Sequence, residues 1–305
     1  MGRAISEIYN RALVRTETCK TPVSGRRLSK LRLRYRRPDF LYLKSPKTGH
    51  TMKLFKTLAC AAVAVCTLLS AHARPLEDIK QSGQLLVATE GQFAPFNYFN
   101  GTTLTGFEVE LAELVAKKMG LKIQWKTLGF DALLTGLRQD RWDLVIASHG
   151  ITDERAKAVT FTAPHYCSGG MIIAMDPAIR TGKDLAGKVV AVQTGTSYLQ
   201  NVQKVAAIKE VKNFPTDVDA RSALNSRRVD AWVTDRFVAK AVVDKNPNAG
   251  FKLGDMLFIE RIAAAVAKGN QPLADAWSKG LAEIMADGSY TELSKKYFNE
   301  DVRCH

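Results

Sequence analysis

An arginine at position 155 closes the segment Asp-Leu-Val-Ile-Ala-Ser-His-Gly-Ile-Thr-Asp-Glu-Arg, which covers residues 143–155. The apolar run 144–147 is typical of a strand buried on both faces, and the acidic residues that follow it are typical of a helix start. Ligands of open α/β sheets bind at the carboxyl ends of strands, where a guanidinium offers a planar fork that matches a carboxylate. The segment therefore predicts a ligand with a carboxylate. The alternative is a surface ion pair between Arg155 and Asp153 or Glu154.

A second polar turn, Thr-Gly-Thr-Ser at 194–197, follows a predicted strand at 188–192 and opens a predicted helix. The free backbone N–H groups and the positive dipole end of such a helix attract an anion. The alternative is an ordinary N-cap, in which a Thr or Ser hydroxyl closes the helix. The sequence lacks the glycine-rich patterns of nucleotide sites, so a nucleotide ligand is not favoured.

Two carboxylates, Asp235 and Glu90, each come directly after a predicted strand and are suited to accept hydrogen bonds from an ammonium group. A helix N-cap is the competing role for Asp235, and Glu90 carries the same ambiguity. The aromatic residues Phe93, Phe96 and Phe130 either line the same site or pack in the core. One cation, an anion-binding helix start and these carboxylates together match the charge layout of a zwitterion, and an α-amino acid fits that description.

Strand and helix patterns alternate around these residues, which predicts α/β sheets with crossover helices. A strand–loop–helix unit near 85–155 and another near 188–240 predict two lobes that face each other across a cleft, a favoured location for small-ligand sites. The predicted strands cover 85–89, 123–125, 144–147, 188–192 and 231–234, the predicted helices begin near 107 and 130, and 91–101 is predicted to be a loop.

The first part of the chain carries most of its excess positive charge. Residues 1–51 hold thirteen Lys/Arg and three acids, out of a net charge of +14 for the chain. We interpret 1–51 as a basic extension from a misassigned start, because 52–73 has the basic, apolar and Ala-x-Ala parts of a secretory signal. A nucleic-acid or membrane-surface arm is the alternative for 1–51. Residues 74–305 are nearly neutral, so we expect no nucleic-acid partner. The predicted signal peptide at 52–73 leads us to expect a periplasmic location.

Cys167 and Cys304 are the two cysteines that follow the predicted signal peptide. An oxidising compartment would permit a disulfide between them, and two inert apolar thiols are the alternative. The histidines and cysteines show no spacing typical of metal ligands, so the sequence predicts no metal and no cofactor.

Several segments, in order along the chain, resemble the periplasmic polar amino-acid-binding proteins of ABC importers, solute-binding family 3. They are Val87-Ala88-Thr89-Glu90 with Phe93-x-Pro95-Phe96, Thr105 to Leu111, Ile151-Thr152-Asp153-Glu154-Arg155, Gly187 to Thr196, Arg228-Val229-Asp230-Ala231, and Tyr290 to Phe298. The resemblance covers about 78–303. It implies a type II periplasmic binding protein fold, in which two α/β lobes joined by two hinge strands close on a ligand.

The resemblance assigns Arg155 to the ligand α-carboxylate, together with backbone N–H groups at 196 and 197, and Asp235 to the α-amino group. It places the ligand side chain between Phe93 and Phe130, with Glu90 near its far end. The implied ligand-binding residues are Glu90, Phe93, Phe130, Ser148, Gly150, Arg155, Thr196, Ser197 and Asp235. Departures from the family pattern include Gly150, where members usually have Ser or Thr, His149, Gln193, and Ile262-Ala263-Ala264 at the second hinge.

We therefore predict a first lobe of 74–166 plus 262–305 and a second lobe of 167–261, with hinges near 166–168 and 260–263. The predicted function is a monomeric receptor that captures an amino acid or related zwitterion and delivers it to an ABC permease. Two alternatives remain. One is a periplasmic enzyme that resembles cyclohexadienyl or arogenate dehydratases, with Glu90 as general acid. The other is a signalling receptor on the same fold.

Overall fold

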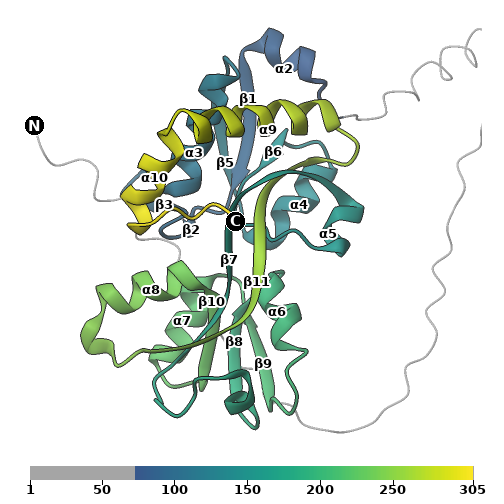
Figure 1. The fold of residues 1–305 in the computed structure, drawn as a ribbon. Helices are drawn as coiled ribbons and strands as arrows, with labels where there is room; N and C mark the ends of the chain where they lie inside the picture. The colour runs from purple at the N-terminus through teal and green to yellow at the C-terminus, as the bar shows by residue number, and fades with distance from the viewer. Residues whose placement is uncertain (1–72, 305) are drawn as a thin grey trace, which may run out of the picture. The chain divides into compact units, whose positions relative to one another are not determined.

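The structure is a computed structural model that describes residues 73–304. The predicted basic extension at 1–51 and the predicted signal peptide at 52–73, apart from Ala73, lie outside the described residues. Within 73–304 the strands and helices alternate as the sequence predicts (Figure 1). No helix in this part of the chain is both long enough and apolar enough to cross a bilayer.

One eight-stranded sheet runs through the molecule, with a group of parallel strands at each end and an antiparallel pair in the middle. In spatial order its strands are β5 (Lys122–Thr127), β1 (Gln84–Thr89), β6 (Leu144–Val145), β11 (Lys252–Ala267), β7 (Val159–Ala174), β10 (Ala231–Asp235), β8 (Val189–Gln193) and β9 (Glu210–Phe214). We call the part built around β1, β5 and β6 the first lobe, and the part built around β8, β9 and β10 the second lobe. The strands β7 and β11 run from one lobe into the other (Figure 1).

Helices accompany the strands of each lobe. The first lobe contains α2 (Leu76–Ser82), α3 (Phe107–Lys118), α4 (Phe130–Arg138), α5 (Asp153–Ala158), α9 (Gln271–Ala286) and α10 (Ser289–Phe298). The second lobe contains α6 (Ser197–Val202), α7 (Asp217–Asn225), α8 (Arg236–Lys245) and the short 3₁₀ helices η1 (Gly182–Leu185) and η2 (Pro247–Ala249). Each lobe encloses fully buried large side chains, such as Leu111 and Trp277 in the first and Trp232 in the second.

The prediction of a loop at 91–101 is wrong. The segment contains β2 (Gln92–Phe93) and β3 (Asn97–Asn100), which form a small antiparallel sheet with β4 (Thr103–Thr105). These strands are short, and turn-forming residues interrupt them, so they show too few alternations for a strand pattern to emerge. The strand predicted at 144–147 is also shorter, because its ladder contains only Leu144 and Val145.

The two linking strands pair in the middle of their length. Ser168 of β7 lies opposite Glu260 of β11, and Tyr166 lies opposite Ile262. The backbones approach closely here, since a Cβ atom at Gly169 would lie 2.0 Å from the Phe258 carbonyl oxygen. The crossing from one lobe to the other is therefore a tight two-stranded ribbon.

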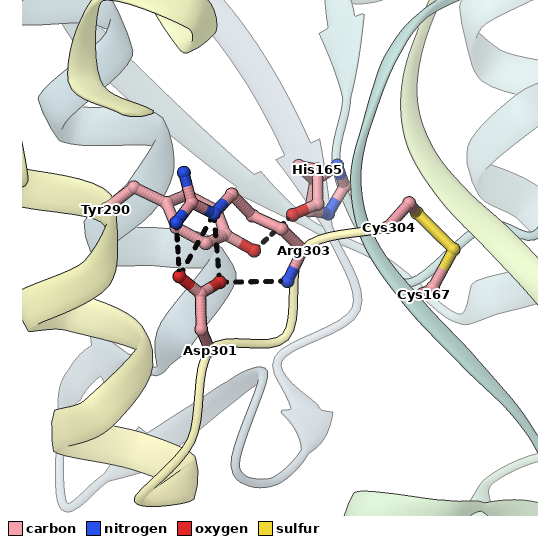
Figure 2. The surroundings of a disulfide bond; sticks show 6 residues. All are labelled: His165, Cys167, Tyr290, Asp301, Arg303 and Cys304. Carbon is pink, nitrogen blue, oxygen red and sulfur yellow. Dashed lines mark hydrogen bonds and ion pairs between the residues drawn. A yellow bond between two sulfur atoms is a disulfide. The ribbon is translucent and has the colours of Figure 1, made fainter. Parts of the chain in front are cut away.

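The C-terminal residues are fastened to the first of these strands (Figure 2). Cys167 of β7 forms a disulfide with Cys304, and its backbone N–H donates to the Val302 carbonyl at 3.1 Å. The Tyr290 hydroxyl of α10 donates to the His165 carbonyl at 2.5 Å. These contacts hold the end of the chain against β7 at the point where that strand leaves the first lobe.

Candidate functional site

A small cavity, with about 10 Å³ of space open to the centre of a water-sized sphere, lies where the carboxyl ends of the strands in the two lobes meet. This space is about that of a single water site, so the side chains of the two lobes nearly fill the cleft between them in this structure. Six of the predicted site residues line it: Glu90, Phe93, Phe130, Ser148, Thr196 and Ser197. Its remaining lining residues are Ala147, Gln193 and Tyr198, whereas Gly150, Arg155 and Asp235 lie outside its wall.

Arg155 connects the two lobes beside this cavity. One guanidinium nitrogen donates to the Gly150 carbonyl at 2.8 Å, and the other donates to the Gly195 carbonyl at 2.9 Å. Its Cζ atom lies 5.7 Å from the centre of the Phe130 ring. Within residues 73–304 these hydrogen bonds go to carbonyl groups rather than to a carboxylate, which differs from the surface ion pair that was the alternative reading.

The polar turn at the start of α6 performs the capping role that the sequence allowed. The Thr196 hydroxyl accepts from the Leu199 N–H at 3.3 Å and donates to the Gln193 carbonyl at 2.7 Å. Ser197 lies in the first turn, and its hydroxyl donates to Glu260 Oε2 at 2.6 Å. Ser197 therefore contacts a carboxylate in this structure, and the carboxylate belongs to the protein.

Asp235 is fully buried at the end of β10 and caps α8. Its Oδ1 atom accepts from the Phe237 N–H at 2.7 Å, but Oδ2 has no hydrogen-bond partner among residues 73–304. Burial raises the pKa of Asp235 to about 7, and the nearby charge of Glu260 acts in the same direction. The capping role thus leaves one carboxylate oxygen for another donor, and the nearby Ser168 hydroxyl acts against the rise in the pKa.

Glu90 joins the first lobe to the second. It lies at the end of β1, and its Oε1 atom accepts from the Gln193 side-chain amide at 2.6 Å. Burial raises the pKa of Glu90 to about 8, with smaller contributions in the same direction from the charges of Asp217 and Asp131. A cationic group in the cavity would lower this pKa again, because an opposite charge favours the ionised carboxylate.

Aromatic rings cover part of the cavity wall. Phe130 stacks on His149 with ring centres 4.3 Å apart, and Phe93 stacks on Phe96 at 5.7 Å. His149 is buried, and burial together with the Arg155 charge moves its pKa well below the usual value. Both effects favour the neutral imidazole, and Phe130, which His149 supports by stacking, offers a flat surface at the cavity wall.

A buried glutamate in α3 positions Ser148. The backbone φ angle of Ser148 is 55°, an uncommon value for a residue with a side chain. Glu108 accepts from the Ser148 N–H at 2.7 Å and from its hydroxyl at 3.0 Å, and His165 Nε2 lies 2.9 Å from the same carboxylate. These bonds fix the backbone of the turn after β6, and Ser148 in that turn forms part of the cavity wall.

Sequence reasoning missed Glu260 as a residue of the site. It was placed only within the second hinge, yet its Oε2 atom reaches Ser197 and lies 2.0 Å from where a Cβ of Gly150 would be. The available signal was the pair of charged residues Glu260 and Arg261 inside the otherwise apolar stretch 256–267. Tyr198 and Glu108 were also missed, because nothing in their spacing distinguishes them from core residues.

Among residues 73–304 no group of His, Cys, Asp or Glu side chains is arranged to hold a metal ion. The molecule combines two α/β lobes, two linking strands and a small cavity between strand ends. They define a two-lobed solute-binding protein.

The comparisons identify the family. Residues 85–300 match the family model for bacterial extracellular solute-binding proteins, family 3, so the chain belongs to this family. It is 35% identical over 259 residues to the L-cystine-binding protein TcyJ of Escherichia coli K12, an alignment that covers 82% of this chain and 96% of that protein. The family and the two-lobed fold that the sequence predicts are thereby confirmed.

Two solved structures are also similar. An ancestral arginine-binding protein bound to arginine has 40% sequence identity and a TM-score of 0.68, over 71% of this chain and 98% of that chain. The ancestral amino acid-binding protein AncCDT-1, a precursor of cyclohexadienyl dehydratase, has 29% identity and a TM-score of 0.68, over 73% of this chain and 99% of that chain.

Proposed function

We propose that the protein is a receptor that binds an amino acid between its lobes for import. The observation that carries this proposal is the pair of opposite charges, Arg155 and Asp235, which flank the cleft without lining the cavity wall itself. The Arg155 guanidinium spans the two lobes through carbonyl groups alone, while the buried carboxylate of Asp235 keeps one oxygen without a partner in residues 73–304. A zwitterion would supply a carboxylate for the first group and an ammonium for the second.

The proposed roles of the site residues follow from this arrangement. Arg155 binds the ligand α-carboxylate, with the backbone N–H groups at 196 and 197, and Asp235 binds the α-amino group. Phe93 and Phe130 enclose the ligand side chain, and Glu90 faces its far end. Ser148 and Gly150 complete the binding surface on the first lobe. The contacts of Arg155 and Glu90 with both lobes support these roles.

We further propose that the first lobe comprises 74–166 plus 262–305 and the second 167–261. Opening and closing would then bend β7 and β11 near their paired residues Ser168 and Glu260. The ligand drives closure because it contacts both lobes only when the cleft is shut.

The proposal extends to the partner and the compartment. The family model that the chain matches is that of extracellular solute-binding proteins. The similar proteins named above bind L-cystine and arginine. We infer that a signal peptide at 52–73 exports the chain to the periplasm, where it acts as a monomer and delivers its ligand to an ABC permease. In the alternative signalling role, the ligand-bound protein would contact a membrane sensor instead of a permease.

Native mass spectrometry of the purified protein, followed by thermal-shift assays, tests the proposal. We expect a co-purified mass that matches an amino acid, and a rise in Tm with arginine, histidine, cystine or another common amino acid. An Arg155→Ala variant serves as the matched control and should lose the shift. The absence of any shift across amino acids and opines would contradict the proposal.

The enzyme alternative receives less support. AncCDT-1, the similar structure that precedes a dehydratase, is itself described as an amino acid-binding protein. Incubation with prephenate or arogenate and measurement of aromatic product would detect a dehydratase directly.

A further inference from the structure

Glu108 of α3 is a fully buried carboxylate that does not line the cavity, yet it contacts three separate segments of the first lobe. Its Oε1 atom accepts from the Ser148 backbone N–H at 2.7 Å and lies 2.9 Å from His165 Nε2. Its Oε2 atom accepts from the Asn97 side-chain amide at 2.8 Å and from the Ser148 hydroxyl at 3.0 Å. A carboxylate has about four acceptor positions, so Glu108 uses all of them within the protein.

Two of these contacts hold segments that form the cavity wall. Ser148 lines the cavity, and its φ angle of 55° belongs to a region in which a residue with a side chain stays only when its surroundings hold it there. Asn97 extends the network to a second wall segment, because its Oδ1 atom accepts at 2.9 Å from the N–H of Gly91, the residue after Glu90. Glu108 therefore fixes the turn after β6 and the turn after β1 relative to each other.

The third contact reaches the linking strand β7. His165 lies in this strand, two residues before Cys167, and its carbonyl accepts from the Tyr290 hydroxyl (Figure 2). Neither the His165 nor the Glu108 side chain has any exposed surface. A buried polar network whose carboxylate is fully satisfied rigidifies the segments that it joins. The cavity wall is thus connected to β7 where that strand leaves the first lobe.

We propose that Glu108 is a positioning residue of the ligand site: it holds the first-lobe wall in its binding arrangement before the ligand enters, without touching the ligand. The proposal rests on the proposed amino-acid receptor and deepens it. A wall that is already ordered loses less conformational freedom when a ligand binds, so the affinity depends on the network.

The test exchanges the acid and the amide across the contact between Asn97 and Glu108. In Glu108→Gln a donor faces a donor in either orientation of the new amide, and in Asn97→Asp two carboxylates face each other. Each single variant should bind the amino acid about tenfold more weakly or worse in calorimetric titration. The double variant Asn97→Asp/Glu108→Gln again pairs each donor with an acceptor, so it should bind within about threefold of the parent. The probe is L-arginine, L-histidine or L-cystine, whichever raises the Tm of the parent.

The matched control is Asp143→Asn, which alters another buried carboxylate of the first lobe. Asp143 precedes β6, at the end of that strand away from the cavity, and accepts from Arg74 Nε at 2.9 Å and from the Leu86 N–H at 2.8 Å. This variant should have a lower Tm but should bind within about twofold of the parent, because its contacts do not reach the cavity wall. If Glu108→Gln also lowers the Tm without weakening binding, the proposal is overturned, since Glu108 then has a structural role alone.

Two further results decide the proposal. The charge of Glu108 acts on Glu90, so an effect of charge alone is the rival explanation. In that case Asn97→Asp, which adds a negative charge, would bind a cationic amino acid more tightly than the parent, and this result would overturn the proposal. If Glu108→Gln does not fold, Asn97→Ala removes the contact without opposing like atoms. Its affinity should fall about threefold or more, and an unchanged affinity would overturn the proposal.

Amide hydrogen exchange of the refolded, ligand-free protein, followed by NMR, separates failure of this proposal from failure of the proposed function. Measured against the amides of β1, which report opening of the whole lobe, the Ser148 and Gly91 amides should exchange about tenfold faster in Glu108→Gln and at the parental ratio in Asp143→Asn. Unchanged ratios in Glu108→Gln would overturn the positioning role. If the ratios rise but the parent binds no amino acid, the receptor function fails while the positioning role stands.

Discussion

Replacement of Glu90 by glutamine should change how the stability of the ligand-free protein depends on pH. Burial raises the pKa of Glu90 to about 8 from the usual value of 4.5, so the folded state holds a proton that the unfolded state releases. Stability from this group is therefore present at low pH and is lost as the pH rises through the interval between the two values. Glutamine does not titrate, and its side-chain oxygen can still accept from Gln193.

The magnitude follows from the width of that interval. Between the two pKa values, the free energy of unfolding should fall by about 1.4 kcal/mol per pH unit because of Glu90. Between about pH 5 and pH 8 this amounts to roughly 4 kcal/mol that the parent loses and the Glu90→Gln variant keeps. Asp235 and Glu260, whose pKa values burial also raises, are not among the groups that act on Glu90, so they contribute alike to both proteins and cancel in the difference.

Urea unfolding of both refolded, ligand-free proteins at several pH values between 5 and 8 measures this difference. The variant should be close to the parent in stability near pH 5 and increasingly more stable as the pH rises. If the free energies of unfolding of the two proteins changed with pH in parallel over the whole range, the reasoning would be refuted. Such a result would show that Glu90 has the same pKa in the folded and unfolded states.

Three further predictions follow from individual contacts. Arg155→Lys keeps the positive charge but loses the planar guanidinium fork, so it should weaken amino-acid binding by about 100-fold in calorimetric titration. An affinity within threefold of the parent would contradict the proposal that Arg155 binds the ligand carboxylate. Gly150→Ser should displace Glu260 from Ser197 and lower the Tm, and the loss should be smaller in a Glu260→Ala background; additive losses would contradict the close contact. Replacing Cys167 and Cys304 together by serine should lower the free energy of unfolding by about 2–5 kcal/mol in urea, since the bridge closes a loop of 137 residues; a change below about 1 kcal/mol would contradict a stabilising bridge.

Much of the fold could be predicted because burial imposes simple patterns. The buried run of β1 and the helical spacing of Leu111 and Val115 in α3 identify their elements directly. The small sheet β2–β3–β4 was not found, since its strands are too short to show alternation. The two linking strands were located by resemblance alone, because their residues change environment as they pass from one lobe to the other.

The candidate site was predictable where a residue follows a buried strand. Glu90 and Asp235 were found for this reason, and both have carboxylates directed into buried surroundings. The sequence left open whether Asp235 caps a helix or accepts from a ligand, and the structure shows that one oxygen caps while the other stays without a partner in residues 73–304. Glu260 was missed because its contact depends on Gly150, which lies more than a hundred residues away in the chain.

Calorimetric titration of the refolded, ligand-free protein with three related molecules tests the central claim most directly. The first is an amino acid that shifts the Tm, and the others are its analogues without the carboxylate and without the ammonium group. We predict that the amino acid binds one per chain with micromolar or tighter affinity, about −8 kcal/mol or more favourable, and that each analogue binds at least about 100-fold more weakly. Equal affinity for all three molecules would contradict a site in which Arg155 holds one end of the ligand and Asp235 holds the other.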